Sequence, residues 1–182
     1  MCSQTDEEKL QQVRCAIRTI PDFPKQGILF RDICPLLKDP KAFNAVIELF
    51  EDHLKKKFPQ IHLILGLDAR GFLFGPVLAH RLGIGFVPIR KKGKLPGPTF
   101  SVSYQLEYGE AEIEIESDSV QAKQKVVIVD DLLATGGTLS AACALMKKVG
   151  ADILECLVVI ELKELNGVKK LNSVPFHSLV QF

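Results

Sequence analysis

The sequence predicts an α/β fold in which helices flank a mainly parallel central sheet. Two observations predict it: short apolar strands alternate with helical segments, and residues 126–129 form a continuous β-branched run, Val-Val-Ile-Val. Alternating strands and helices favour parallel pairing, and a continuous apolar run is typical of a strand buried on both faces. With 182 residues, 47% of them hydrophobic, we expect one domain spanning residues 1–182.

The N-terminal segment is predicted to hold one helix and then an ordered loop. Thr5 and Glu8 are spaced as a capping box, and apolar residues follow at helical spacing until Pro21 stops the helix. Residues 29–33 mix apolar and charged side chains without a clear period, so we expect a loop there. A second helix opens at Asp39-Pro40, with its apolar stripe at Phe43, Val46, Ile47, Phe50 and Leu54.

The strands and helices of the predicted sheet follow. We expect strands at residues 61–65, 86–89, 126–129 and 153–160, with helices at residues 72–82 and 138–149 that end at Gly83 and Gly150. Between residues 91 and 119 the apolar residues alternate instead, which predicts a hairpin that turns near Gly109. Because glycines and prolines precede this hairpin, we expect it to leave the sheet as a mobile flap.

The chemistry is expected where the strand at residues 126–129 ends. Asp130 and Asp131 follow it directly, and ligands of open α/β sheets bind at the carboxyl ends of strands. The next turn holds Ala134, Thr135, Gly136, Gly137 and Thr138. Its glycines permit close approach of the backbone and its amides begin a helix, so it suits a phosphate monoester. The two carboxylates would repel phosphate, so we expect them to accept hydrogen bonds from sugar hydroxyls, which describes a 5-phosphoribosyl pocket.

Residues 126–138 resemble the phosphoribosyl pyrophosphate (PRPP) signature of the type I phosphoribosyltransferases. Further motifs resemble the adenine phosphoribosyltransferase family: Phe-Arg-Asp-Ile at residues 30–33, Gly-Leu-Asp-Ala-Arg-Gly-Phe at 66–72, Ile-Arg-Lys-Lys-Gly-Lys-Leu-Pro-Gly at 89–97 and Leu-Glu-Tyr-Gly at 106–109. The resemblance runs from Leu10 to the C-terminus. It implies the type I fold with an N-terminal hood over residues 1–35, which binds the base, and a flexible flap over residues 91–119.

The resemblance also implies a reaction and a set of site residues. The reaction is Mg²⁺-dependent transfer of 5-phosphoribosyl from PRPP to N9 of adenine, giving AMP and pyrophosphate with inversion at the anomeric carbon. The Mg²⁺ would be held by PRPP and water, with no dedicated protein ligand. The implied residues are Glu107 and Tyr108 for catalysis; Asp130 and Asp131 for ribose; Asp68, Ala69, Arg70, Arg90, Lys91 and Lys94 for pyrophosphate; and Leu29, Phe30, Arg31 and Leu132 for adenine.

Composition agrees with a cytoplasmic enzyme. Lys plus Arg (23) nearly balance Asp plus Glu (22), which disfavours nucleic acid or an anionic membrane as a partner. The five cysteines form no Cys-x-x-Cys pair, so we expect reduced thiols rather than a metal site. The resembling family is dimeric, so we also expect a homodimer.

Two other functions stay open at this point. One is a purine transferase that uses hypoxanthine or guanine instead of adenine. The other is a PRPP-sensing regulatory protein that has lost turnover, which would be expected to lack the acidic pair or the flap, or to carry a DNA-binding segment.

Overall fold

The structure, a computed structural model, describes residues 4–105 and 109–182. The chain forms two compact units, Met1–His53 and Leu54–Phe182, with the boundary inside helix α3 (Pro40–Lys57). The single domain expected over residues 1–182 and the hood over residues 1–35 stay predictions.

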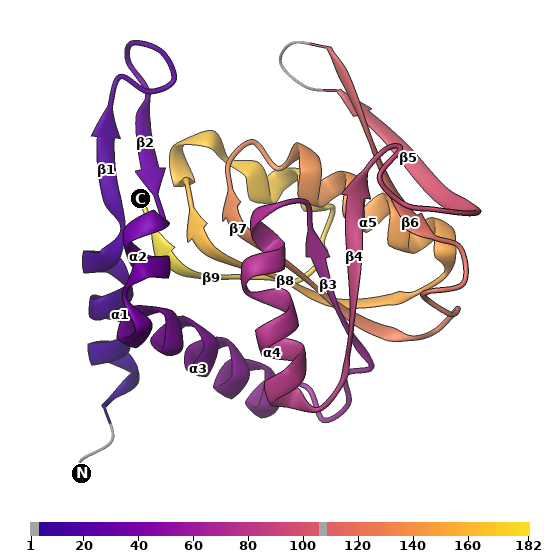
Figure 1. Ribbon diagram of the computed structural model, residues 1–182, viewed down its shortest axis with the longest axis horizontal. Helices are drawn as coiled ribbons and strands as arrows, with labels where there is room; N and C mark the ends of the chain where they lie inside the picture. The colour runs from indigo at the N-terminus through magenta and orange to yellow at the C-terminus, as the bar shows by residue number, and fades with distance from the viewer. Residues whose placement is uncertain (1–3, 106–108) are drawn as a thin grey trace. The chain divides into compact units, whose positions relative to one another are not determined.

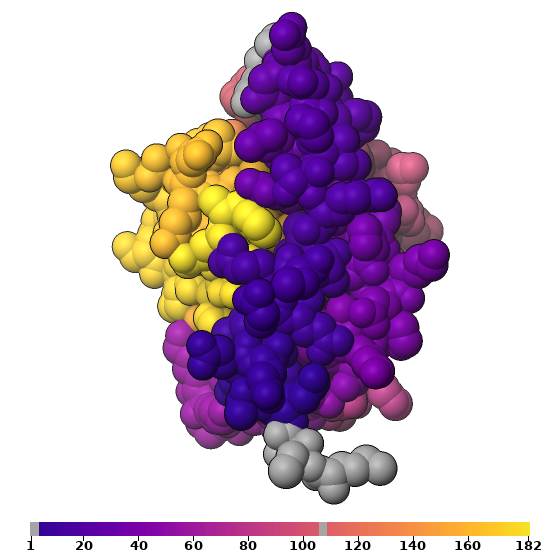
Figure 2. All heavy atoms as spheres, turned by 90° about the vertical axis from the view of Figure 1, so that its left-hand side faces the viewer, coloured from indigo at the N-terminus to yellow at the C-terminus, as the bar shows by residue number. Residues whose placement is uncertain are grey.

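The first unit holds helix α1 (Asp6–Ala16), strands β1 (Arg18–Pro21) and β2 (Leu29–Asp32), helix α2 (Cys34–Lys38) and most of α3. Figure 2 shows this N-terminal part of the chain in indigo and violet. The predicted capping box is confirmed, since Thr5 Oγ1 accepts a hydrogen bond from the Glu8 amide and Glu8 Oε2 accepts one from the Thr5 amide. Val13, Leu36 and Phe50 are fully buried in this unit.

Two predictions for the first unit are wrong. Helix α1 ends at Ala16 and not at Pro21, because residues 18–21 form β1 and pair antiparallel with β2. Residues 29–33 were expected to form a loop, yet most of them form β2. Hydrogen bonds from Arg18 to Asp32 and from Arg31 to Thr19 add to the backbone ladder between the two strands. Such a short polar pair has no periodic pattern that would reveal it in the sequence.

The second unit is built on a seven-stranded sheet with the order β5-β6-β4-β3-β7-β8-β9. Its strands are β3 (Leu63–Leu67), β4 (Gly85–Lys91), β5 (Thr99–Gln105), β6 (Glu110–Glu116), β7 (Lys125–Leu133), β8 (Asp152–Glu161) and β9 (Phe176–Gln181). From β4 to β9 all neighbours are parallel, whereas β6 is antiparallel to both β4 and β5. The mainly parallel sheet is therefore confirmed, and β9 is a strand that the sequence did not reveal.

Helices α4 (Gly75–Leu82) and α5 (Gly137–Val149) lie on opposite faces of this sheet (Figure 1). The topology explains this arrangement. The chain passes from β3 through α4 to β4 in one direction and from β7 through α5 to β8 in the other, and right-handed crossovers in opposite directions place their helices on opposite faces. Both helices end at the predicted glycines, Gly83 and Gly150, which have positive φ angles of 69° and 82°.

Three short 3₁₀ helices complete the second unit. Residues Arg70–Leu73 form η1, so the helix predicted to begin at residue 72 starts as a 3₁₀ turn and becomes α-helical only at Gly75. Between β8 and β9 lie η2 (Lys163–Leu165) and η3 (Gly167–Leu171).

The predicted hairpin is confirmed as the antiparallel pair β5–β6. Its base does not leave the sheet, because Arg90 pairs with Glu114 and Lys91 with Ile113 between β4 and β6. The apolar alternation of the hairpin and the Pro/Gly-rich segment before it did not reveal this pairing. The mobility expected of the flap stays a prediction.

Candidate active site

The candidate site is a cleft of about 1250 Å³ at the carboxyl ends of β3, β4 and β7. From β3 the chain crosses to β4 on one side, and from β7 it crosses to β8 on the other, so the strand order reverses between β3 and β7. A crevice opens at such a switch point, because the loops after its two strands turn to opposite faces of the sheet. All residues that line the cleft belong to the second unit.

Asp130 and Asp131 lie in the cleft, as the sequence predicts. Strand β7 continues beyond the predicted residue 129 to Leu133, so both carboxylates stand on the rigid sheet and not on a loop. Asp130 Oδ1 accepts a hydrogen bond of 2.9 Å from the Asp131 amide. Burial raises the pKa of Asp130 well above its usual range, and the neighbouring charge of Asp131 raises it further. The pair therefore combines two acceptors whose ionisation is costly because they are buried side by side.

The guanidinium of Arg70 pairs with this acidic couple. Its Nε lies 2.7 Å from Asp131 Oδ2, and the Arg70 side chain is half-exposed while that of Asp131 is buried. Burial raises the pKa of Asp131, and the charge of Arg70 offsets part of that increase. The structure thus brings together a residue expected at pyrophosphate and one expected at ribose.

Residues 134–138 follow β7 directly and lead into α5, so this segment joins a strand to the N-terminus of a helix, as predicted. We call it the phosphate loop, after the ligand that the sequence predicts for it. The amides of the first turn of a helix have no partner within the helix, which makes them available to an anion. Gly136 has a φ of 79°, and a Cβ at this position would lie 2.3 Å from the carbonyl oxygen of Gly167. Glycine is therefore required here on two counts, backbone conformation and space.

The loop after β3 carries Asp68, Ala69 and Arg70 into the cleft, where all three line the wall. The peptide bond between Asp68 and Ala69 is cis. Asp68 Oδ2 lies 3.2 Å from Nε of Arg90, so the end of β4 is tied to this loop. A Cβ at Gly71 would lie 2.4 Å from the carbonyl oxygen of Val129, which shows how closely the loop packs on β7.

The three cationic residues at the end of β4 and just after it are placed differently from one another. Lys91 lines the cleft, whereas Arg90 is held by Asp68 and lies near the ring of Phe72. Lys94 is exposed and is not among the described residues that line the cleft. The structure therefore brings only Lys91 of the three to the cleft wall.

The hairpin contributes Tyr104, Gln105, Ala111 and Ile113 to the opposite wall. The hydroxyl of Tyr104 lies 3.4 Å from Oγ1 of Thr138, which links β5 to the phosphate loop. The predicted catalytic residues, Glu107 and Tyr108, lie outside the described residues.

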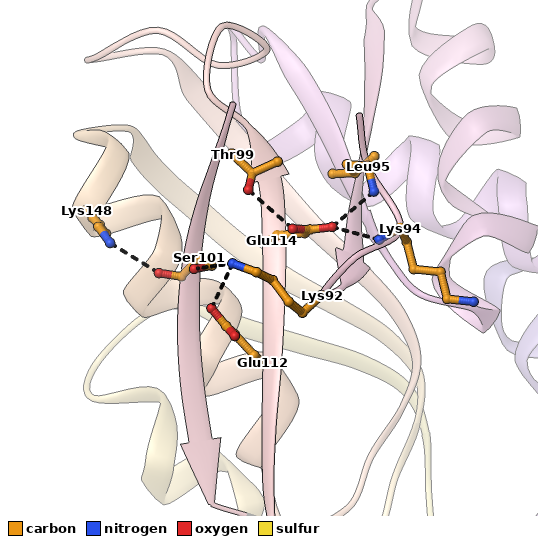
Figure 3. A network of polar contacts seen from close by, with 8 residues as sticks. All are labelled: Lys92, Lys94, Leu95, Thr99, Ser101, Glu112, Glu114 and Lys148. Atoms are coloured by element: carbon orange, nitrogen blue, oxygen red, sulfur yellow. Dashed lines mark hydrogen bonds and ion pairs between the residues drawn. The ribbon is translucent and has the colours of Figure 1, made fainter. Parts of the chain in front are cut away.

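The base of the hairpin is held by a buried carboxylate, Glu114 (Figure 3). Its Oε1 accepts hydrogen bonds from the amides of Lys94 (2.9 Å) and Leu95 (3.0 Å), and its Oε2 accepts one from the hydroxyl of Thr99 (3.2 Å). Burial alone would raise the pKa of Glu114, but these donors outweigh it and the pKa is lowered. The charged carboxylate thus fixes the segment between β4 and β5.

The residues expected at adenine belong to different units. Leu132 lines the cleft, whereas Leu29, Phe30 and Arg31 lie on β2 of the first unit. There Phe30 packs edge-to-face against Phe23 with ring centroids 5.0 Å apart, and Leu29 is exposed over 56% of its surface.

Sequence reasoning missed several residues of the cleft. Leu165 and Lys170 line it from the segment before β9, and Gln105 lines it from the hairpin. For Gln105 and Tyr104 the alternation of the hairpin was a usable signal. For Lys170 no local signal exists, because apart from Leu165 the other described residues of the cleft are more than thirty residues earlier in the chain.

Two features of the described residues bear on cofactors and membranes. Within residues 4–105 and 109–182, no three His, Cys, Asp or Glu side chains form a group that could hold a metal ion. No helix in the described part of the chain is both long and apolar enough to cross a membrane.

Comparison with known sequences gives close matches. A family described as "Phosphoribosyl transferase domain" matches residues 35–174. The chain is 59% identical to the adenine phosphoribosyltransferase of Dipodillus campestris over 177 residues, which cover 97% of this chain and 98% of that protein. It is 58% identical to that of Rattus norvegicus with the same coverage.

Solved structures give the same result. The fold is similar to that of adenine phosphoribosyltransferase from Saccharomyces cerevisiae, complexed with D-2,5-dideoxy-2,5-imino-altritol 1,6-bisphosphate and adenine. The TM-score is 0.93 at 44% sequence identity, and the match covers 96% of this chain and 99% of that chain. The enzyme from Trypanosoma brucei, in complex with AMP, pyrophosphate and ribose-5-phosphate, gives a TM-score of 0.88 at 28% identity, covering 98% of this chain and 82% of that one.

Proposed function

The chain belongs to the adenine phosphoribosyltransferases, and on that premise we propose how the residues of its cleft carry out the transfer of 5-phosphoribosyl from PRPP to adenine. The products are AMP and pyrophosphate. One observation carries the assignment of roles: Asp130, Asp131 and the phosphate loop at residues 134–138 line one cleft together with Arg70. One cleft therefore offers acceptors for sugar hydroxyls, donors for a phosphate and a cation for a leaving group, which are the partners that PRPP needs.

The ribose and its phosphate are bound at the end of β7. Asp130 and Asp131 accept hydrogen bonds from the two vicinal hydroxyls of the ribose, and the phosphate loop donates its amides and the hydroxyls of Thr135 and Thr138 to the 5′-phosphate. Support comes from their position on one strand–turn–helix segment, where the carboxylates and the loop line the same cleft.

The pyrophosphate is bound at the ends of β3 and β4. Arg70 and Lys91 face it from the cleft wall, and Asp68 and Ala69 offer the backbone of the loop after β3. Arg90, which is paired with Asp68, and Lys94 are added on the family resemblance alone. As N9 of adenine attacks the anomeric carbon, the bond from that carbon to the pyrophosphate oxygen breaks and its electron pair leaves with pyrophosphate. Positive charge develops on the sugar and negative charge on the leaving group, so both need partners.

The family resemblance assigns adenine to Leu132 of the second unit and to Leu29, Phe30 and Arg31 of the first. Apolar side chains suit the faces of a flat ring, and backbone groups read its polar edge. Glu107 accepts or orients the proton that N9 loses, and Tyr108 helps the flap close over the reactants. These roles rest on the family resemblance of residues 106–109.

Mg²⁺ arrives with PRPP in this proposal. The oxygen-rich cleft suits a hard cation, since the carboxylates of Asp130 and Asp131 lie in it. When bound, the ion neutralises charge on the leaving pyrophosphate. The residues of the chain bind the ribose and the phosphates.

Two further properties follow from family membership. We propose that the protein forms a homodimer and acts in the cytoplasm. Light scattering on the purified protein tests the first, and fractionation of cells that express it tests the second.

One incubation tests the function directly. Radiolabelled adenine, guanine and hypoxanthine are each offered with PRPP and Mg²⁺, and nucleotide formation is measured. We expect AMP from adenine at a rate far above that from either oxopurine. Faster use of guanine or hypoxanthine would assign the chain to another purine transferase, and no turnover with any base would favour a regulatory PRPP-binding protein.

A paired substitution tests the ribose assignment. Asp130→Asn with Asp131→Asn should weaken PRPP and AMP by tenfold or more, on the order of 1.4 kcal/mol, and spare free adenine. Asp118→Asn serves as the control, because Asp118 is exposed in the turn after β6. An equal loss of affinity for all three ligands would contradict a role at ribose.

A further inference from the structure

The helix η3 packs backbone against backbone on the phosphate loop. A Cβ at Gly167 would lie 2.2 Å from the carbonyl oxygen of Ala134 and 2.9 Å from the amide nitrogen of Gly136. In the reverse direction, a Cβ at Gly136 would lie 2.3 Å from the carbonyl oxygen of Gly167. No side chain separates the two segments at this point, so η3 forms part of the loop's surroundings.

The geometry of η3 places Lys170 on the same side as Gly167. A 3₁₀ helix has three residues per turn, so residues three apart lie above one another on one face. Gly167 and Lys170 are three apart within η3, and Lys170 lines the same cleft as residues 134–138. The preceding residue, Lys169, is also a lysine, but it lies on a different face of η3 and is not among the residues that line the cleft.

The distribution of charge in the cleft leaves the phosphate end with one cation. The described cations that line it are Arg70, Lys91 and Lys170. Arg70 is paired with Asp131, and Lys91 is the last residue of β4, which is two strand positions or roughly 10 Å from β7. Lys170 is exposed and makes no ion pair with any carboxylate in the described part of the chain.

A phosphate in the loop needs more than neutral donors. The loop supplies amides and hydroxyls, while the carboxyl groups of Asp130 and Asp131 line the same cleft. A phosphate dianion held beside two carboxylates gains from a nearby cation, and a lysine ammonium is a common point-charge partner of phosphate.

We infer that Lys170 is a further binding residue that closes the phosphate loop from outside and pairs with the 5′-phosphate of PRPP and AMP. This inference rests on the proposed role of residues 134–138. Because Lys170 stands at the exposed rim, its contribution is electrostatic and sensitive to salt. It acts on every ligand that carries the 5′-phosphate and on none that lacks it.

The test compares Lys170→Met with Lys169→Met, a matched change on the same helix. Affinities for AMP and for adenosine, which lacks the phosphate, are measured by calorimetry at low and high ionic strength. For Lys170→Met at low salt we expect AMP to bind about tenfold more weakly, a smaller difference at high salt, and unchanged adenosine affinity. We expect Lys169→Met to bind AMP as the wild type does, and Lys170→Arg to restore most of the affinity.

Turnover gives an independent readout. Lys170→Met should raise KM for PRPP and leave kcat and KM for adenine near their wild-type values. Equal AMP affinity in the Lys170→Met and Lys169→Met proteins would overturn the inference, and so would a loss of adenosine affinity as large as that of AMP. If wild-type protein binds AMP no more tightly than adenosine, the proposed phosphate-binding role of residues 134–138 is wrong. This result differs from the results that would overturn only the role of Lys170.

Discussion

Arg70 and Asp131 form an ion pair, with Nε of the arginine 2.7 Å from Oδ2 of the aspartate. Arg70 comes from the segment after β3 and Asp131 from strand β7, and the proposed roles put them at different parts of PRPP. Their contact means that the charge state of Asp131, the proposed ribose ligand, depends on Arg70, the proposed pyrophosphate ligand.

The first prediction concerns pH. Burial raises the pKa of Asp130 and Asp131 above their usual value of 3.8, so the folded protein binds more protons than the unfolded chain above that pH. The pair's contribution to the free energy of unfolding therefore falls as pH rises from about 4 through the raised pKa. Affinity for PRPP should rise over the same window, because ionised carboxylates are the better acceptors. Thermal melts and PRPP titrations across this pH range measure both trends.

Substitution of Arg70 extends this test. Arg70→Met removes the charge that lowers the pKa of Asp131, so the midpoint of the PRPP pH profile should move to higher pH. Arg70→Lys keeps a positive charge and should leave the midpoint near that of the wild type. An unshifted midpoint in Arg70→Met would show that the ion pair does not control ionisation.

The second prediction concerns Gly136. An alanine there would need a φ of 79° and would place its Cβ 2.3 Å from the carbonyl oxygen of Gly167. We expect Gly136→Ala to lower the free energy of unfolding by about 2 kcal/mol and to weaken PRPP binding, because the loop must move. Gly137→Ala is the steric control, since the nearest atom to its Cβ would be 3.7 Å away. Urea denaturation compares the two, and equal stabilities would contradict the prediction.

The third prediction concerns the base of the hairpin. Glu114→Ala removes the acceptor of two amides and a hydroxyl in a buried position, which should cost about 1–3 kcal/mol. Trypsin should then cleave faster after Lys92 and Lys94. Glu112→Ala is the matched control, because Glu112 is on the same strand but its carboxylate accepts from the exposed ammonium of Lys92. If both variants are cleaved at the wild-type rate, Glu114 does not fix this segment.

The fourth prediction concerns Glu107. Glu107→Ala should lower kcat by about a hundredfold or more while the affinity for PRPP changes little, since proton transfer is worth that much in many enzymes. Glu110→Ala, at the start of β6, removes a neighbouring exposed carboxylate and should keep wild-type turnover. Unchanged turnover in Glu107→Ala would remove this residue from the mechanism.

Local pattern was sufficient to predict the segment of the cleft that runs from β7 to α5. A buried strand, two carboxylates, a glycine turn and a helix follow one another within β7, the phosphate loop and α5, so their relative placement is set by adjacent residues. The alternation of the hairpin was equally readable.

Long-range pairing explains what the sequence did not reveal. Strands β1 and β2 exist because each supplies the other's hydrogen bonds, and β9 exists because β8 is its neighbour. The approach of Gly167 to Gly136 and the pairing of Arg70 with Asp131 likewise depend on segments far apart in the chain. Hydrophobic periodicity carries no information about such contacts.

The contact between Gly136 and Gly167 also bears on synthesis of the protein. A growing chain folds from its N-terminus, and β3, β7 and the glycine turn are made well before residue 167. Until the ribosome has added Gly167, the turn lacks the backbone that it rests on in the finished enzyme. The nascent protein can therefore acquire its sheet early, but its nucleotide pocket reaches its mature form only near the end of translation.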